Sequence, residues 1–280
     1  LFNRTFMILG GMLVLTTISS RFNKAYETKT EFFITVGGTF LSLFVIYFLG
    51  DQFPANIFAV GVFSLFIGWS LGPTIASIGE KFKFRKFLKD KMVLSKTITT
   101  KKTTLTDRLI GKEDEKKTVY FFKSDPEKTF DRMSNEFREL KLDFEKNVLP
   151  HDRYNQEWQN IVFQALIGTT LAVLLTATIV VFTDNDFGFL GPILLICLIA
   201  LVIMEFLNAF FFKSRRRRLI QAYFGVVLFT LYLIYDFNRL EKAIARGDDS
   251  WSTAIDIAVN IYLDLINLFI DLLEILASSE

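Results

Sequence analysis

The sequence NIYLDLINLFIDLLEI (residues 260–275) decides how this chain folds, because it sets carboxylates into an otherwise apolar helix. Leu, Ile and Phe fill most of its positions. The polar residues in this part of the chain are Asp256, Asn260, Asp264, Asn267, Asp271 and Glu274. At about 100° per residue, all six lie within roughly 80° of one another around a helix. The segment is therefore predicted to be a helix with a single polar stripe.

A polar stripe of this kind cannot face lipid, where one aspartate in the middle of a helix costs about 2.5–3.5 kcal/mol. It has to face either the inside of a helix bundle or water. The alternative is a water-exposed surface helix, but the other faces of this segment are too apolar for that role. We therefore expect the last helix to be central and enclosed by the others.

The composition indicates a polytopic membrane protein. The chain has 280 residues, of which 51% are hydrophobic and 32 are Phe. The apolar residues form blocks close to the length of about 20 residues that crosses a bilayer as a helix, the form in which the backbone satisfies its own hydrogen bonds. We predict an all-α protein with seven transmembrane helices. The predicted spans are 2–20, 31–50, 55–78, 158–182, 187–212, 219–240 and 252–276.

These spans divide the chain into residues 1–80 with helices one to three, residues 81–157, and residues 158–280 with helices four to seven. The middle part holds 20 Lys or Arg and 14 Asp or Glu residues, so it is predicted to be a polar insert outside the lipid. Its first segment, KFKFRKFLKDK (81–91), is interpreted as a basic extension of the third helix at the membrane interface rather than a nucleic-acid site. Residues 95–117 are polar and low in complexity, and we expect them to be mobile.

The end of the insert is predicted to be an amphipathic helix over residues 125–148. Ser124 and Glu127 have the spacing of a capping box, and Pro126 suits a first turn. The apolar residues recur at three- and four-residue spacing, as in a coiled coil. They are Phe130, Met133, Phe137, Leu140 and Phe144. This stripe could pair with itself, with a protein partner or with the membrane, and the sequence does not choose between these.

The distribution of basic residues predicts the orientation. The sequence SRRRR (214–218) and the loops after the first and third spans are basic, whereas the loops after the second and fourth spans are not. The positive-inside rule therefore places the insert and the C-terminus in the cytoplasm. The single cysteine, Cys197, and the single histidine, His151, exclude a disulfide within the chain and a metal site built from such residues.

A second acid lies at a matching position in the sixth span. Positions equidistant from the turn ARGDDS (245–250) place Asp236 opposite residue 260 or 261, and Asp264 lies one helical turn further on, about 5 Å in rise. Two close carboxylates in a low dielectric do not both ionise cheaply, so we expect them to share a proton. The pair would act as a pH-responsive latch. The alternative is two independent acids, each with its own polar partner.

Several stretches of the chain resemble one family. LYLIYDFNRLEKA (231–243), followed by the stretch from residue 260 to 276, resembles the C-terminal signature of the transmembrane BAX inhibitor motif family, the Bax inhibitor-1-like proteins. FQALIGTT (163–170) and DFGFLGPILL (186–195) resemble the family's fourth span and the start of its fifth, and GWSLGPTIASI (68–78) resembles the end of its third.

The resemblance implies a seven-helix fold with a central last helix. It also implies a pH-sensitive calcium leak channel, as in bacterial members, or suppression of stress-induced cell death, as in eukaryotic members. The aspartates of the YD and YLD motifs, which form the family's pH sensor, correspond to Asp236 and Asp264. The chain departs from the pattern in its insert of about 75 residues, in Asp271 where Asn is common, and in LGDQFP (49–54) where basic residues are usual. The family's orientation is also opposite to the one that the charges predict.

The first hypothesis for function is a passive, pH-regulated calcium or cation leak channel gated by Asp236 and Asp264. Oxygen ligands suit calcium, and acids inside a bundle mark ion paths. The predicted ion path consists of Asn260, Asn267, Asp271, Glu274 and Glu205. The two gate acids are also predicted to hold calcium transiently, as the transported ion and not as a cofactor. We expect no enzymatic activity, no nucleic-acid partner, and a location in a bacterial cytoplasmic membrane.

Two other hypotheses remain. One is a membrane regulator without transport activity, acting on cell death or on a membrane protease through a protein partner or self-association at residues 125–148. The other is an intramembrane aspartyl protease, a class that also places YD on one helix and a second aspartate on the next. Its second element, Gly-Leu-Gly-Asp, is absent, because the chain reads IYLD at residues 261–264.

Overall fold

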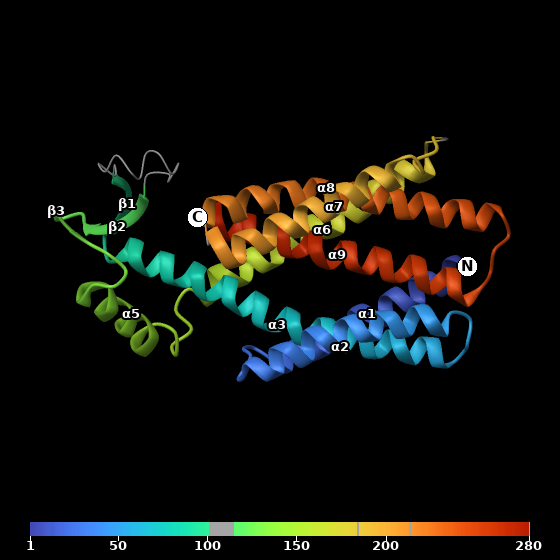
Figure 1. The fold of residues 1–280 in the computed structure, drawn as a ribbon, viewed down its shortest axis with the longest axis horizontal. Helices are drawn as coiled ribbons and strands as arrows, with labels where there is room; N and C mark the ends of the chain where they lie inside the picture. The colour runs from blue at the N-terminus through green and yellow to red at the C-terminus, as the bar shows by residue number, and fades with distance from the viewer. Residues whose placement is uncertain (101–114, 184, 213, 280) are drawn as a thin grey trace, which may run out of the picture. The chain divides into compact units, whose positions relative to one another are not determined.

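The computed structural model describes residues 1–100, 115–183, 185–212 and 214–279. The chain divides into two compact units, one formed by Leu1–Gly79 with Asn160–Glu280 and the other by Glu80–Gln159. Figure 1 shows the path of the chain through both. Each unit is described by itself.

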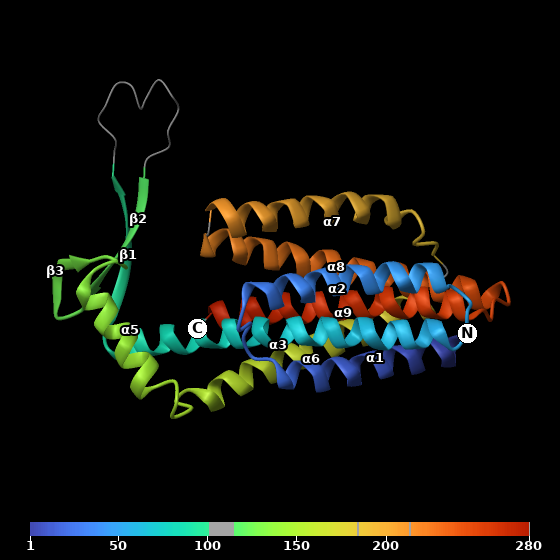
Figure 2. The same ribbon diagram turned by 60° about the horizontal axis from the view of Figure 1, so that its bottom comes forward.

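The larger unit is a bundle of long helices. Its helices are α1 (Phe2–Phe22), α2 (Lys29–Leu49), α3 (Ala55–Asp90), α6 (Asn155–Val181), α7 (Leu190–Leu207) with the π-helical turn η1 (Asn208–Phe212), α8 (Arg215–Ala245) and α9 (Trp251–Ser279). Short connections join most of them, so helices that are consecutive in the chain run antiparallel. Helices α7 and α8 lie side by side (Figure 2).

Six helices in the described part of the chain are long and apolar enough to cross a membrane, namely α1, α2, α3, α6, α7 with η1, and α8. The chain is therefore described as an integral membrane protein. Helix α9 is not among the six. The predicted count of seven spans is not confirmed by these criteria.

Helix α9 is enclosed by the rest of its unit. It packs against α8 on one side and α1 on the other, and lies between them in Figure 1. Within α9, all of whose residues are described, only Asp256 and Ser279 are exposed. The hydroxyl groups of Tyr262 on α9 and Thr16 on α1 are joined by a buried hydrogen bond. The last helix thus has the enclosed position that its polar stripe predicts.

Helices α1 and α3 approach one another closely near the end of α1. A Cβ atom at Gly72 would lie 2.0 Å from the backbone oxygen of Asn23, so only glycine fits there. The hydroxyl of Ser19 donates to the backbone oxygen of Leu65 at 2.7 Å. Small and hydroxylated residues at such crossings are typical of helix packing in membranes.

The smaller unit combines a sheet with a helix. Strands β1 (Val93–Thr100), β2 (Glu115–Phe122) and β3 (Asp125–Phe130) form an antiparallel sheet in the order β1-β2-β3. Helix α5 (Asn135–Asn147) and the last turns of α3 complete the unit. Aromatic side chains from all three parts form its core, including Phe87, Tyr120 and Phe144.

This unit differs from two expectations. The protein is mainly helical, as predicted, but residues 93–100 and 115–122, most of which lie in the segment expected to be mobile, are paired strands. Threonine-rich sequence such as TITT favours strands through its β-branched side chains. The rest of that segment, residues 101–114, lies outside the described residues. In the basic segment 81–91, α3 continues to Asp90, as the predicted extension of the third helix requires, and the side chains of Phe82 and Phe87 are buried.

The predicted helix over residues 125–148 is wrong in its first part. Residues 125–130 form the edge strand β3, where Pro126 is tolerated because its missing N–H is not needed. The helix begins at Asn135, and the Ser134 hydroxyl accepts a hydrogen bond from the Phe137 N–H at 3.1 Å. The cap is therefore Ser134 rather than Ser124.

The apolar stripe of this segment is mostly used inside the unit. The side chains of Phe130, Phe137 and Phe144 are buried in the core, whereas Met133 is exposed. The predicted surface for a partner or a second copy is therefore largely occupied by the unit's own side chains.

Candidate functional site

The turn between α8 and α9 sets the two acidic helices against one another. Gly247 has a φ of 73°, a left-handed conformation that suits glycine and lets the chain reverse. Asp248 then accepts hydrogen bonds from the Ser250 N–H at 2.9 Å and from the Thr253 hydroxyl at 2.7 Å. These bonds lower the pKa of the Asp248 carboxyl. The turn is thus fixed at the point where α9 begins, so the pairing of the two helices is fixed as well.

This pairing brings Asp236 of α8 and Asp264 of α9 together inside the unit. Their exposed fractions are 2% and 6%. The two carboxyl groups interact with one another across the interface between the two helices. Among the described residues, no N–H or hydroxyl donates to the Asp264 Oδ2. A hydrogen bond between two carboxyl groups would require a proton on one of them.

Arg239 flanks the pair. Its Nη1 donates to the Asp236 Oδ1 at 3.3 Å, and its Nη2 donates to the Asp256 Oδ2 at 2.5 Å. The guanidinium group therefore bridges α8 and α9 at the outer side of the carboxyl pair. Arg239 is 35% exposed and Asp256 is 57% exposed, so this end of the site faces outward from the bundle.

Sequence reasoning did not identify this arginine as part of the site. The signal was present, because Asp236 and Arg239 are three residues apart on one helix and such pairs are neighbours on its surface. Arg239 lies on α8 beside Asp236. It supplies a basic group beside the carboxyl pair in a chain that has LGDQFP where the family resemblance leads one to expect basic residues.

The other predicted site residues form a second acidic region further along α9. Asn260, Asn267, Asp271 and Glu274 are half-buried on this helix. Asp271 lies seven residues after Asp264, about 10 Å further along the axis. Glu205 on α7 is exposed but interacts electrostatically with Asp271.

The second region is closely packed against α8. A Cβ atom at the buried Gly225 would lie 2.0 Å from the Asp271 Oδ2, so the carboxyl group rests against bare backbone. The Glu274 Oε1 lies 3.9 Å from the Arg218 Nη1. The structure thus gathers Asp271, Glu274 and Glu205 in one region and the Asp236–Asp264 pair in another.

A metal centre is not evident in the described part of the chain, where no group of three or more His, Cys, Asp or Glu residues is placed to hold an ion. The carboxyl pair alone offers few of the roughly six to eight oxygen ligands that calcium takes.

Comparison with known proteins identifies the part of the chain that carries the site. Residues 153–280 match the family described as "Inhibitor of apoptosis-promoting Bax1". This range contains α6, α7, α8 and α9. It therefore includes the carboxyl pair and its arginine, together with the second acidic region.

Relatives from three kinds of organism each match less than half of the chain. The protein is similar to Protein LIFEGUARD 4 of Arabidopsis thaliana, 34% identical over 43% of this chain and 48% of that protein. An uncharacterized protein of Campylobacter jejuni is 38% identical over 42% of this chain and 48% of that protein. The Golgi anti-apoptotic protein of vaccinia virus is 31% identical over 43% of this chain and 48% of that protein. The chain thus spans about half the length of the curated relatives it matches. Residues 153–280 are thus similar to proteins of the Bax inhibitor-1-like family.

Proposed function

We propose that this protein is a membrane regulator that works as a passive, pH-regulated leak for calcium and other cations, gated by Asp236 and Asp264. The observation that carries the proposal is the buried, interacting carboxyl pair between α8 and α9. We propose that the two carboxyl groups share one proton. In this proposal α9 is a seventh membrane span and the central one, and its polar stripe is the path. The proposal includes no catalytic step.

The gate works through the shared proton. While it is present, the two carboxyl groups hold α8 and α9 together. As the pH rises the proton leaves, and two like charges in a low dielectric repel one another strongly. Arg239 can then pair fully with Asp236, which frees Asp264 to move with α9. The stripe formed by Asn260, Asn267, Asp271 and Glu274, with Glu205, offers the oxygen atoms that calcium prefers.

A second candidate is a regulator that acts only through partners. It is favoured by the name of one relative, the Golgi anti-apoptotic protein of vaccinia virus, which refers to control of cell death. The insert supports it less than the sequence predicts, because Phe130, Phe137 and Phe144 are buried within their own unit. Relatives in Campylobacter jejuni and Helicobacter pylori support our proposal that the membrane is a bacterial cytoplasmic one.

A protease is supported least. An aspartyl protease needs two carboxyl groups that share and activate a water molecule. Here the two carboxyl groups interact with each other, and Arg239 contacts one of them. A peptide-cleavage assay that is positive for the wild type and negative for Asp264→Asn would restore this candidate.

The test is calcium flux into liposomes that contain the purified protein, measured between about pH 5 and pH 8, the range in which a perturbed carboxyl pair can titrate. We expect flux to rise with pH. Asp236→Asn and Asp264→Asn should remove the pH dependence, and Glu241→Gln, an exposed acid on the same helix, should keep it.

The outcomes separate the candidates. Flux with an unchanged pH dependence in both asparagine variants contradicts the two-aspartate gate. Absence of flux at every pH from a correctly folded protein contradicts the leak and leaves the partner-dependent regulator. Flux that falls with rising pH contradicts the direction in which we expect the shared proton to act.

A further inference from the structure

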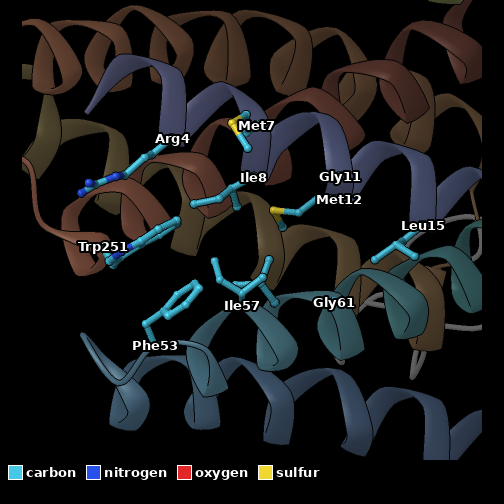
Figure 3. A pocket seen from close by; sticks show the side chains of 11 residues that line it. Arg4, Met7, Ile8, Gly11, Met12, Leu15, Phe53, Ile57, Gly61 and Trp251 are labelled. Atoms are coloured by element: carbon cyan, nitrogen blue, oxygen red, sulfur yellow. The ribbon is translucent and has the colours of Figure 1, made fainter.

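A pocket of about 370 Å³ lies between α1, α3 and the start of α9, away from the carboxyl pair (Figure 3). Its α1 wall includes Arg4, Gly11 and Leu15, and its α3 wall includes Gly61. Trp251, the first residue of α9, closes one end. Apart from Arg4, the side chains that line it are apolar or aromatic.

The position of the pocket determines whether it opens to lipid or to water. Helices α1 and α3 are both long and apolar enough to cross a membrane. The two glycines make the space, since a Cβ atom at Gly11 would meet nothing within 4 Å and one at Gly61 would meet only Leu15, at 3.6 Å. An apolar hollow of this kind on spanning helices opens to hydrocarbon rather than to water.

The mouth of the pocket has the chemistry of a membrane interface. Arg4 lies over the ring of Trp251, 4.9 Å from its centre, and Phe53 stacks on the same ring at 4.9 Å. The Arg4 Nη2 is 3.2 Å from the Asp249 Oδ2, which holds the guanidinium group in place. Tryptophan and arginine together at a helix end are typical of the headgroup level.

The length of the pocket matches one leaflet. From Arg4 to Leu15, α1 rises about 16 Å along its axis. Half of a hydrocarbon core of about 30 Å is about 15 Å, which is the depth that one lipid chain fills. The positively charged end and the apolar depth therefore correspond to the two parts of one lipid molecule.

We propose that this pocket holds one acyl chain of a glycerophospholipid whose phosphate lies at Arg4. The guanidinium group has five N–H donors in a fork that suits phosphate, and Asp249 uses only part of it. The site does not depend on the proposed gate. It is a lipid site built from α1, α3 and the start of α9, outside most of the family match.

The experiment uses Trp251 as the reporter. In a Trp69→Phe, Trp158→Phe background, Trp251 is the one remaining tryptophan of the chain. Phosphatidylglycerol with brominated acyl chains is titrated into the protein in detergent, and quenching of the Trp251 fluorescence is recorded. An acyl chain bound in the pocket gives quenching that saturates with lipid concentration. Random partition of the lipid gives quenching that grows linearly with lipid concentration.

Matched variants test whether the acyl chain binds in the pocket. Gly11→Leu should fill the pocket and abolish the saturable quenching, and Gly61→Leu should do the same from α3. Gly10→Leu is the control, because Gly10 is an equally open glycine on α1 that does not line the pocket. Thermal unfolding verifies that each variant is folded.

The headgroup is tested separately. A brominated diacylglycerol lacks the phosphate and should bind about tenfold more weakly, as should the phospholipid to Arg4→Gln. Equal saturable quenching in the wild type and both filled variants, or linear quenching throughout, overturns the acyl-chain site. Equal affinity for diacylglycerol and phospholipid overturns the role of Arg4.

Discussion

The two acidic regions of α9 accommodate their carboxyl groups in different ways. At Asp264, the neighbouring helix supplies a second acid, Asp236, which interacts with it. At Asp271, the carboxyl group occupies the space above Gly225 of the neighbouring helix. The first arrangement joins two titratable groups, whereas the second depends on shape. In the proposed function, the gate therefore lies at the first region and the second is a fixed part of the path.

The largest effect is expected at the carboxyl pair. Asp236→Ala leaves Asp264 buried without its partner, and removal of one member of a buried polar pair costs about 3–5 kcal/mol. Asp236→Asn keeps a hydrogen-bonding group in place, so this variant should lose much less stability. Thermal or chemical unfolding in detergent measures both variants. Equal stability of Asp236→Ala and the wild type would show that the pair does not hold α8 and α9 together.

A smaller effect is expected at Gly225. Gly225→Ala forces the Asp271 carboxyl group to move, and overpacking of this kind costs about 1–3 kcal/mol. The matched control is Gly10→Ala, where a Cβ atom meets nothing within 4 Å. The double variant Gly225→Ala/Asp271→Ala should recover the stability that Gly225→Ala loses. A double-mutant cycle of unfolding free energies therefore measures the coupling between the two residues. Strict additivity would contradict the contact.

Arg239→Gln should cost about 1 kcal/mol or less, because the guanidinium group is partly exposed and solvent screens its ion pairs. The cost should shrink further at high salt. Arg239→Lys keeps the charge but loses the two-pronged geometry that reaches both Asp236 and Asp256, so it should recover only part of the loss. Unfolding at two salt concentrations provides the measurement, and a salt-independent loss would argue against an electrostatic role.

The smallest effect on stability is expected at Asp186, an exposed acid. The Lys242 ammonium group donates a hydrogen bond to Asp186, and the Gly188 N–H donates another, so both lower the pKa of this carboxyl. Its contribution to stability is present above the usual carboxyl pKa of about 3.9 and is lost as the pH falls through the lowered value. Asp186→Asn should therefore be slightly less stable than the wild type at neutral pH. A difference that persists in strong acid would contradict this pairing.

The sequence contains enough information to predict the meeting of Asp236 and Asp264. Both lie on uninterrupted helices joined by a short turn, so a count of residues from the turn gives their depth, and helical periodicity gives the face of α9. Gly225 could not be assigned in this way, because its contact with Asp271 depends on the rotation of α8 about its own axis. That rotation is set by packing along the whole length of the helix.

The insert was less predictable because local signals compete there. Ser124 and Glu127 fit a capping box, but residues 125–130 pair instead with β2. Ser134 has no Glu or Gln three residues later, yet it caps α5. Pairing with a distant strand outweighed the local helix signal, as tertiary contacts commonly do. The lipid pocket lay beyond sequence reasoning altogether, because its walls come from α1, α3 and α9.

The enclosed position of α9 has a consequence for biosynthesis. Proteins emerge from the ribosome N-terminus first, so α9 is made after α1 and α8. It is also the helix whose acids make it least able to enter lipid alone. By the time it arrives, Thr16 and Asp236 are already in place to receive Tyr262 and Asp264. A chain that stops before α9 would leave Asp236 without its partner in the bilayer, and that incomplete bundle is the form that cellular quality control would have to remove.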